Sequence, residues 1–391
     1  MSSGCPFCGN NPTSHSLTWY FESSNVLYTP LRQVLFYNKI SNFLKQSFFK
    51  VHASRYIVKT LLGLKILSIQ KEINKCAVRR AQVLWEEAIK RDINFFELQV
   101  FGKSFDTYIA SKNGRSLIFS GLPRPVNYNN LALDTMDDKI IFKRKLAAAG
   151  LPVPRGGEAT TLSKALKIFD LIKKPIIVKP RAGSRGRHTS TFVFTREELK
   201  QAYKIAKQLC HWVIVEEQLK GPVYRATLIN FELVGVLRGD PPQVVGDGQH
   251  TLDELIKIKN LNPHPGVKNI EADIKTEIFL SRQKLNLSGV PKAGQVVELS
   301  EKIGVNYGGS SSEDFSICHP DNKALFVQAA KVAGDPVVGF DFIIPDVALS
   351  FKEQECGFIE ANSLPFINLH HDPLKGEPQN VAQKVWELVG F

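Results

Sequence analysis

The sequence predicts an α/β (α+β) protein with two or three domains, and three observations support this class. The chain has 391 residues, enough to bury more than one hydrophobic core. Hydrophobic residues make up 43% of it, but no run of eighteen uncharged apolar residues occurs, so no transmembrane helix is predicted. Helical and strand-like patterns alternate along the chain, as in small α/β units.

Residues 1–30 are rich in Ser, Asn and Thr and show little periodicity, which predicts a flexible N-terminal tail. Because its first residues lack both a basic region and an apolar stretch, no secretory signal is predicted and a cytoplasmic location is expected. The tail contains Cys5-x-x-Cys8, half of a zinc knuckle. Only His15 lies nearby, and other histidines such as His188 lack metal-ligand spacing, so a flexible tail is favoured over a zinc site.

Residues 31–135 are predicted to form a basic helical region followed by a small α/β domain. Between 31 and 80 there are eleven Lys or Arg and one acid, Glu72, a net charge of +10 against +12 for the whole chain. A helical pair with a solvated basic face is favoured, while contact with an anionic membrane, nucleic acid or an acidic polymer or peptide stays open. One helix is then expected over 77–90, with strands at 95–101, 107–111 and 116–120 and a linker near 121–130.

Residues 136–391 continue the alternation of helices and strands. A helix with Asp in its first turn ends at Gly150, before Pro152. Thr195 with Glu198, and Thr251 with Glu254, form capping boxes that begin two further helices. Strands are expected at 174–180, 189–195, 212–219, on both sides of a turn near Asn230, at 339–346 and around Glu360.

The loop at 181–188, RAGSRGRH, joins two strands and carries glycines. A Walker loop would instead lead into a helix and end in Gly-Lys-Ser/Thr. Backbone amides at Gly183, Ser184 and Gly186 can still close over phosphates, with Lys179 as a point charge. Such hairpins are common, so the loop alone is weak evidence.

Asp341, Glu360 and Asn362 form a candidate metal site. Residues i and i+2 of a strand share a face, so Glu360 and Asn362 should point the same way. If the two strands pair, Asp341 joins them and supplies the oxygen ligands that suit Mg²⁺. The alternative is that acidic residues simply end two strands.

Several segments taken together resemble a known family. The order Lys139, Lys179, VIVEEQLKG, YR, VVGDGQHTLDELI, NYGGSSSEDFSICHPDN and IEANSLPFINLHHDP resembles the ATP-grasp domain of cyanophycin synthetase and of bifunctional glutathione synthetases. The resemblance covers about 136–391, with a mobile lid expected at about 152–219. No Mur-type ligase domain follows, so cyanophycin synthesis itself is not expected.

The resemblance implies an ATP- and Mg²⁺-dependent carboxylate–amine ligase that forms a peptide or amide bond through an acyl phosphate. Two Mg²⁺ ions are implied, with Mn²⁺ as an alternative, together with amino-acid or peptide substrates and a homo-oligomer. The implied site residues are Lys139, Lys179, Gly183, Ser184 and Gly186 for the ATP phosphates; Glu216, Glu217 and Leu219 for adenine; Arg225 and Arg238 for catalysis; Asp341, Glu360 and Asn362 for metal; and Asn306, Gly308, Gly309 and His370 for substrate.

Three residues depart from the family pattern. His188 replaces a third glycine in the loop, Val223 stands where relatives place an acid for the ribose, and Phe366 replaces a small residue beside the acceptor site. These departures motivate an alternative function, a nucleotide-binding regulatory or scaffolding protein without ligase turnover. A third hypothesis is a macromolecular acceptor, recruited through the basic segment 31–80.

Overall fold

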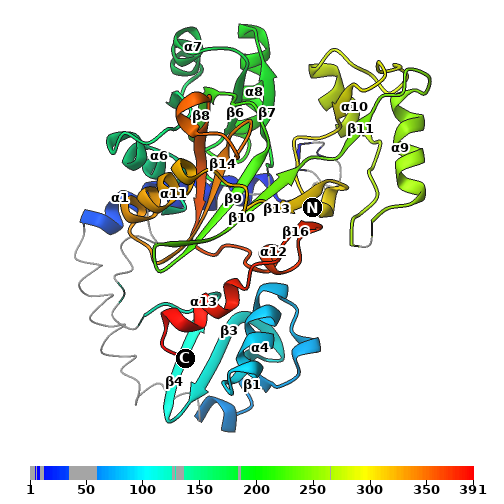
Figure 1. The fold of residues 1–391 in the computed structure, drawn as a ribbon. Helices are drawn as coiled ribbons and strands as arrows, with labels where there is room; N and C mark the ends of the chain where they lie inside the picture. The colour runs from blue at the N-terminus through cyan, green and yellow to red at the C-terminus, as the bar shows by residue number, and fades with distance from the viewer. Residues whose placement is uncertain are drawn as a thin grey trace.

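The computed structural model describes residues 5, 7–8, 13–34, 60–125, 128, 136–183, 186–264 and 266–391. Half of the basic segment 31–80, namely residues 35–59, and Ser184 of the glycine loop lie outside these residues. The described helices and strands build four sheets and their covering helices (Figure 1). Within these residues, no helix combines the length and the apolar character needed to cross a membrane.

The central sheet has six strands in the order β15–β14–β9–β10–β13–β16. Their bounds are Gly357–Asn362, Val337–Ile343, Val223–Ile229, Glu232–Asp240, Ser310–Glu313 and Lys375–Gly376. Helices α6 (Lys139–Ala148) and α11 (Pro320–Ala333) share a buried core with one face of this sheet, which includes Phe142, Phe326 and Phe340. Because strand side chains alternate between faces, the other face is left for polar residues.

A second sheet, β5–β8–β6–β7, occupies 156–217, inside the range predicted for the lid. Its strands are Gly156–Ala159, Val213–Glu217, Ile176–Pro180 and Ser190–Val193, and its helices are α7 (Leu162–Leu171) and α8 (Arg196–Lys207). These elements enclose a hydrophobic core of their own. The capping box predicted at the start of α8 is confirmed. The mobility of this unit stays a prediction.

A small module inserted after β10 contains β11 (Gln243–Val245), α9 (Leu252–Leu261), α10 (Ile274–Arg282) and β12 (Val296–Glu298). The two strands pair antiparallel, and a compact apolar cluster joins them to both helices. The predicted capping box at Thr251 and Glu254 begins α9. The 3₁₀ helix η3 (Val305–Tyr307) then leads back to the central sheet, while η4 (Phe351–Glu353) lies between β14 and β15.

The N-terminal domain is an antiparallel sheet with the order β1–β2–β3–β4. Its strands are Leu67–Gln70, Asn94–Val100, Lys103–Lys112 and Arg115–Ser120; η1 (Ile73–Lys75) and α4 (Arg79–Lys90) lie between the first two. The C-terminal helix α13 (Val381–Leu388) also packs here, beside α4 (Figure 1). The C-terminus therefore joins the core of the N-terminal domain, although the sequence analysis assigned it to the unit at 136–391.

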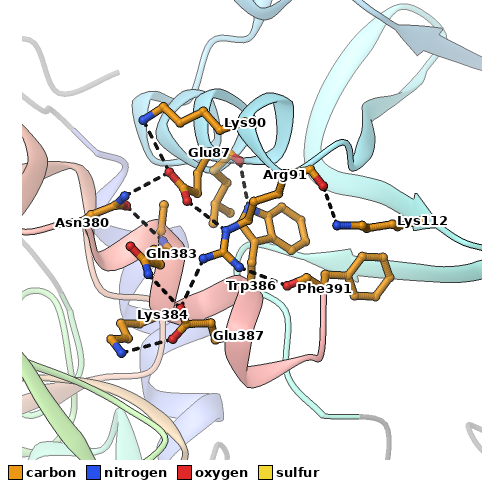
Figure 2. Close-up of polar contacts among 12 residues, drawn as sticks. Glu87, Lys90, Arg91, Lys112, Asn380, Gln383, Lys384, Trp386, Glu387 and Phe391 are labelled. Carbon is orange, nitrogen blue, oxygen red and sulfur yellow. Dashed lines mark hydrogen bonds and ion pairs between the residues drawn. The ribbon is translucent and has the colours of Figure 1, made fainter.

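Polar contacts fasten α13 to α4 (Figure 2). The indole Nε1 of Trp386 donates to the Leu84 carbonyl at 3.0 Å. Arg91 pairs with Glu87 at 2.9 Å and with Glu387 at 3.2 Å, so one guanidinium bridges the two helices. Asn380, at the start of α13, donates to Glu87 at 3.0 Å. The fully buried Trp386 is thus both packed and hydrogen-bonded.

The segment 15–34 differs from its prediction. It forms helix α1 (His15–Val34) and crosses the boundary expected near residue 30 between tail and basic region. Ser23 and Val26 are buried, and the Ser23 hydroxyl accepts a hydrogen bond from the His211 backbone amide at 2.9 Å. Tertiary contacts of this kind stabilise a helix that its weak periodicity does not reveal.

His371 is expected to make stability depend on pH. It ends α12 (Asn368–His371), and its Nε2 accepts the Ala382 backbone amide at 3.1 Å, in the first turn of α13. Burial lowers the pKa of His371 to about 4. The unfolded chain, with a histidine pKa near ~6.5, therefore binds the extra proton first as the pH falls. The free energy of unfolding should fall between about pH 6.5 and 4, and urea unfolding of His371→Gln should show less of this loss. Equal pH profiles for the two proteins would contradict this role.

Candidate active site

The predicted metal ligands meet on one face of the central sheet. Strands β14 and β15 pair antiparallel with Asp341 opposite Glu360, so the condition under which Asp341 joins the other two predicted ligands is met. Asp341 is also opposite Arg225 on β9, and Asn362 is opposite Gly339, two residues before Asp341. Paired residues share a face, so Arg225, Asp341, Glu360 and Asn362 lie on the face away from α11.

The charges on this face are closely matched. Arg225 forms a two-pronged ion pair with Asp341, with one of its contacts at 3.0 Å. Lys139 lies 3.4 Å from Glu360 and donates to the Gly183 carbonyl at 3.0 Å, which ties the metal face to the glycine loop. Burial raises the pKa of Asp341, to about 6, against the attraction of Arg225. Burial also acts on Glu360, but Lys139, Arg225 and Lys179 outweigh it and lower the pKa of Glu360 to about 2.

Two buried nitrogens on this face have no hydrogen-bond partner among the described residues, Nη1 of Arg225 and Nδ2 of Asn362. Buried polar atoms normally find a partner, so each is a place where a ligand oxygen can be received. The two carboxylates and the Asn362 amide supply hard oxygen donors, the set that suits Mg²⁺. The residues present therefore fit the predicted metal and an anionic substrate.

A second charged cluster lies where the lid meets this face. Lys179 pairs with Glu216 at 2.6 Å, and Lys143 contacts the other oxygen of the same carboxylate. Burial acts on Glu216, but the two lysines outweigh it and lower its pKa to about 2, whereas burial lowers the pKa of Lys143 to about 8. The sequence analysis missed Lys143. Lys143 lies four residues after Lys139 and therefore on the same face of the helix, and this spacing could have identified it.

The other residues predicted to contact ATP lie in the glycine loop and at the hinge of the lid. Gly183 and Gly186 adopt φ of 124° and 63°, which suit glycine. Ser184 lies outside the described residues. Glu217, the neighbour of Glu216, accepts from the Lys173 backbone amide at 3.2 Å. Glu217 and Leu219 line a cavity of about 560 Å³ at the hinge between lid and central sheet.

Arg238 is separated from this site. On β10 it is opposite Tyr224, while Leu237 is opposite Arg225. Arg238 therefore points to the face of the sheet that carries Tyr224, where it pairs with Asp240 at 2.8 Å. The residues on either side of Arg238, Leu237 and Gly239, are the ones that lie on the Arg225 face. The structure thus brings Arg225 to the predicted metal ligands and leaves Arg238 out.

The predicted substrate residues also separate. His370 is fully buried, with Nε2 2.7 Å from the Thr227 hydroxyl and Nδ1 2.6 Å from Glu313. Both ring nitrogens are engaged, so His370 holds the sheet rather than facing an open site. Asn306 lines a cavity of about 130 Å³, whereas Gly308 and Gly309 line another of about 220 Å³.

Two of the three family departures lie at exposed or half-buried positions. Val223 begins β9 and is half-buried. Phe366 follows β15 and is 53% exposed, so its ring is available to a substrate. The third departure, His188, is fully buried.

Comparisons with known proteins find relatives of this chain. Residues 138–226 match the family model "Carbamoyl-phosphate synthase L chain, ATP binding domain". The chain is 29% identical over 318 residues to the glutathione biosynthesis bifunctional protein GshAB of Clostridium perfringens, which covers 79% of this chain and 40% of that protein. It is 30% identical over 266 residues to cyanophycin synthetase of Trichormus variabilis, which covers 66% of this chain and 30% of that protein.

A solved structure is similar as well. The bifunctional glutathione synthetase from Pasteurella multocida superposes with a TM-score of 0.55 at 27% identity. The match covers 79% of this chain and 43% of that one. The chain therefore spans less than half the length of each of these relatives.

Proposed function

Because the chain is an ATP-grasp protein, similar to bifunctional glutathione synthetases and cyanophycin synthetases, we propose that it is an ATP-dependent carboxylate–amine ligase. The observation that carries the proposal is the convergence of Arg225, Asp341, Glu360 and Asn362 on one sheet face, with Lys139 linking that face to the glycine loop. The ATP-grasp fold predicted from the sequence is confirmed by the similarity to the Pasteurella multocida enzyme.

The reaction that suits these residues has two steps. A substrate carboxylate oxygen attacks the γ-phosphorus of ATP, and ADP leaves. An amine then attacks the carbonyl carbon of the resulting acyl phosphate, inorganic phosphate leaves, and an amide bond remains. No nucleophilic side chain is required, because positioning and charge neutralisation supply the catalysis.

Each residue of the site has a part in these steps. Asp341, Glu360 and Asn362 would hold Mg²⁺, which when bound neutralises phosphate charge and keeps the reacting oxygens in line. Arg225 is aligned by its two contacts with Asp341, and its Nη1, which has no partner among the described residues, would donate to the transferring phosphoryl group. Lys179 is held by Glu216, and Lys139 by Gly183, so both cations have fixed positions from which they would contact the ATP phosphates.

The lid has a chemical task in this proposal. An acyl phosphate is hydrolysed unless water is kept from it, so the sheet at 156–217 must close over the site before the first step. The amine and carboxylate are proposed to be amino acids or short peptides. The exposed Phe366 ring, beside the metal strand, is proposed to contribute to their selection.

The experiment that tests the proposal is ADP release with Mg²⁺ and ATP against pooled amino acids and short peptides. Wild type should release ADP with at least one pool. Glu360→Gln, which removes a metal ligand, should lower that rate at least about 100-fold. Glu197→Gln, an exposed acid that pairs with Lys200, is the matched control and should retain the rate.

Silence of folded, ATP-bound wild type in every pool would count against ligation of small substrates. Binding of ATP without any turnover would then favour the regulatory or scaffolding function. If activity appears only with a macromolecular acceptor and disappears on deletion of residues 1–75, the basic segment is a recruitment site. Calorimetry with ATP separates a failure of binding from a failure of turnover.

A further inference from the structure

Four metal-binding side chains meet at the outer end of the glycine loop. Cys5, Cys8, His15 and His188 each direct one ligand atom to a common point, and these atoms all lie within 4.8 Å of one another. Cys8 and His188 are buried, while Cys5 and His15 are half-buried. The sequence analysis found too few partners for the cysteines because His188 lies 180 residues beyond Cys8.

The separations have the size that a tetrahedral zinc ion requires. Sγ of Cys8 lies 3.4 Å from Nε2 of His188 and 3.2 Å from Nε2 of His15, and Sγ of Cys5 lies 3.6 Å from Nε2 of His188. With Zn–S near ~2.3 Å and Zn–N near ~2.0–2.1 Å, a tetrahedral ion places S and N about 3.6 Å apart. A hydrogen bond from a thiol would account for one sulfur beside each imidazole nitrogen. Nε2 of His188 instead lies beside two sulfurs, those of Cys5 and Cys8.

His188 is oriented as metal-binding histidines are. Its Nδ1 lies 2.8 Å from the Ile205 carbonyl. Nδ1 must therefore carry the proton and donate, which leaves the lone pair of Nε2 directed at the sulfurs. The His188 backbone has φ of 54°, a left-handed conformation that is unfavourable for a non-glycine residue. This cost is offset when the conformation aims the ring at a ligand.

Backbone hydrogen bonds also hold the two cysteines close to His188. The Cys8 amide donates to the Cys5 carbonyl at 3.3 Å, which forms a tight turn, and the His188 amide donates to the Phe7 carbonyl at 3.0 Å. Phe7 also lines the cavity that contains Asn306. The turn therefore lies between the lid and the loop predicted to bind substrate.

We propose that Cys5, Cys8, His15 and His188 bind one structural zinc ion that fastens the N-terminal segment to the lid. A tetrahedral set of two sulfurs and two imidazoles selects zinc, and four protein ligands leave no position for substrate. Binding replaces the two thiol protons, so each Zn²⁺ bound releases two protons and no redox change occurs. The departure at His188 is explained, since a glycine there would lack the fourth ligand.

Helix α1 extends the attachment. The helix begins at His15, one of the four proposed ligands. Further along it, the Ser23 hydroxyl accepts a hydrogen bond from the His211 backbone amide. The Trp19 ring packs edge-on against the His211 ring, with 6.3 Å between the ring centroids. His188 and His211 stand at opposite ends of the segment that contains α8. The N-terminal segment should therefore move with the lid as one body.

The test is the zinc content of the purified full-length protein, measured by mass spectrometry after dialysis against a weak chelator in reducing buffer. Wild type should retain one zinc per chain. His188→Gly and Cys8→Ser should lose it, with Zn²⁺ affinity more than about 100-fold weaker in competition with a chromophoric chelator, beyond the loss typical of outer-shell mutations. Cys356→Ser and His250→Ala, outside the cluster, should retain the metal.

Cobalt substitution gives an independent signal. Co²⁺ in wild type should show the visible bands of a tetrahedral site and a thiolate charge-transfer band, both absent in His188→Gly. His188→Gly introduces the glycine that the family resemblance implies at this position, and circular dichroism of the variant checks that it folds. Equal zinc affinity in wild type and His188→Gly, or a wild-type affinity no stronger than that of Cys8→Ser, would overturn the proposal.

Discussion

Replacing Arg225 by Gln is expected to lower substrate-dependent ADP release by about 10²–10³-fold, while Arg238→Gln should leave the rate within about threefold. Arg225 is paired with Asp341, lies on the face of the metal ligands and has an unpartnered buried nitrogen among the described residues. Arg238 lies on the opposite face, and it is already paired with Asp240. Its side chain is also more exposed to solvent than the side chain of Arg225. The measurement is ADP release with the substrate pool found for wild type.

A second variant separates catalysis from folding. Arg225→Lys keeps the positive charge beside Asp341 but cannot make two parallel contacts, so it should be folded and still lose most of the rate. Circular dichroism and ATP calorimetry check that both arginine variants fold and bind. If Arg238→Gln loses as much activity as Arg225→Gln, the prediction is wrong that only the arginine on the face of the metal ligands takes part in catalysis.

Local chemistry made much of this fold predictable. The capping boxes at Thr195 and Thr251 are read from residues three positions apart, and both begin the expected helices. Alternation of apolar residues predicted the two strands that carry Asp341 and Glu360, whereas their pairing entered the sequence analysis only as a condition that the structure fulfils. These features depend on neighbours along the chain.

The features that escaped prediction depend on register or on distant contacts. Whether an arginine on β10 faces the metal ligands changes with a shift of one residue, and the resemblance alone did not show that Arg238 lies opposite Tyr224 and not opposite Arg225. His188 meets Cys5 and Cys8 only because the chain folds back over more than 180 residues. The docking of α13 onto α4 likewise joins the two ends of the chain, and no local pattern reports it.

The other large effect is expected at Glu216, where sequence resemblance indicated an adenine contact and the structure shows a buried ion cluster. Its carboxylate meets Lys143 and Lys179, and all three side chains are buried. Glu216→Gln leaves two buried lysines without a counter-charge, and removal of one partner from a buried pair costs about 3–5 kcal/mol. Urea unfolding should therefore show a loss of this size in the free energy of unfolding.

Glu217→Gln is the matched control, because the next residue of β8 points to the other side of the strand and accepts only one backbone amide. Its effect should stay below about 1 kcal/mol. The loss in the free energy of unfolding of Glu216→Gln, relative to wild type, should also become smaller as the pH rises from 7 toward 10. Buried lysines without a partner have a lowered pKa, so the unfolded chain binds more protons in that range and the stability of the variant rises with pH.

A double variant tests the same cluster from the other side. Adding Lys143→Met to Glu216→Gln removes one of the two unpaired charges and replaces it with an apolar chain of similar length, so part of the lost stability should return. Recovery would establish that uncompensated charge causes the loss of stability. A double variant less stable than Glu216→Gln alone would instead mean that the Lys143 ammonium stabilises the lid through contacts other than Glu216.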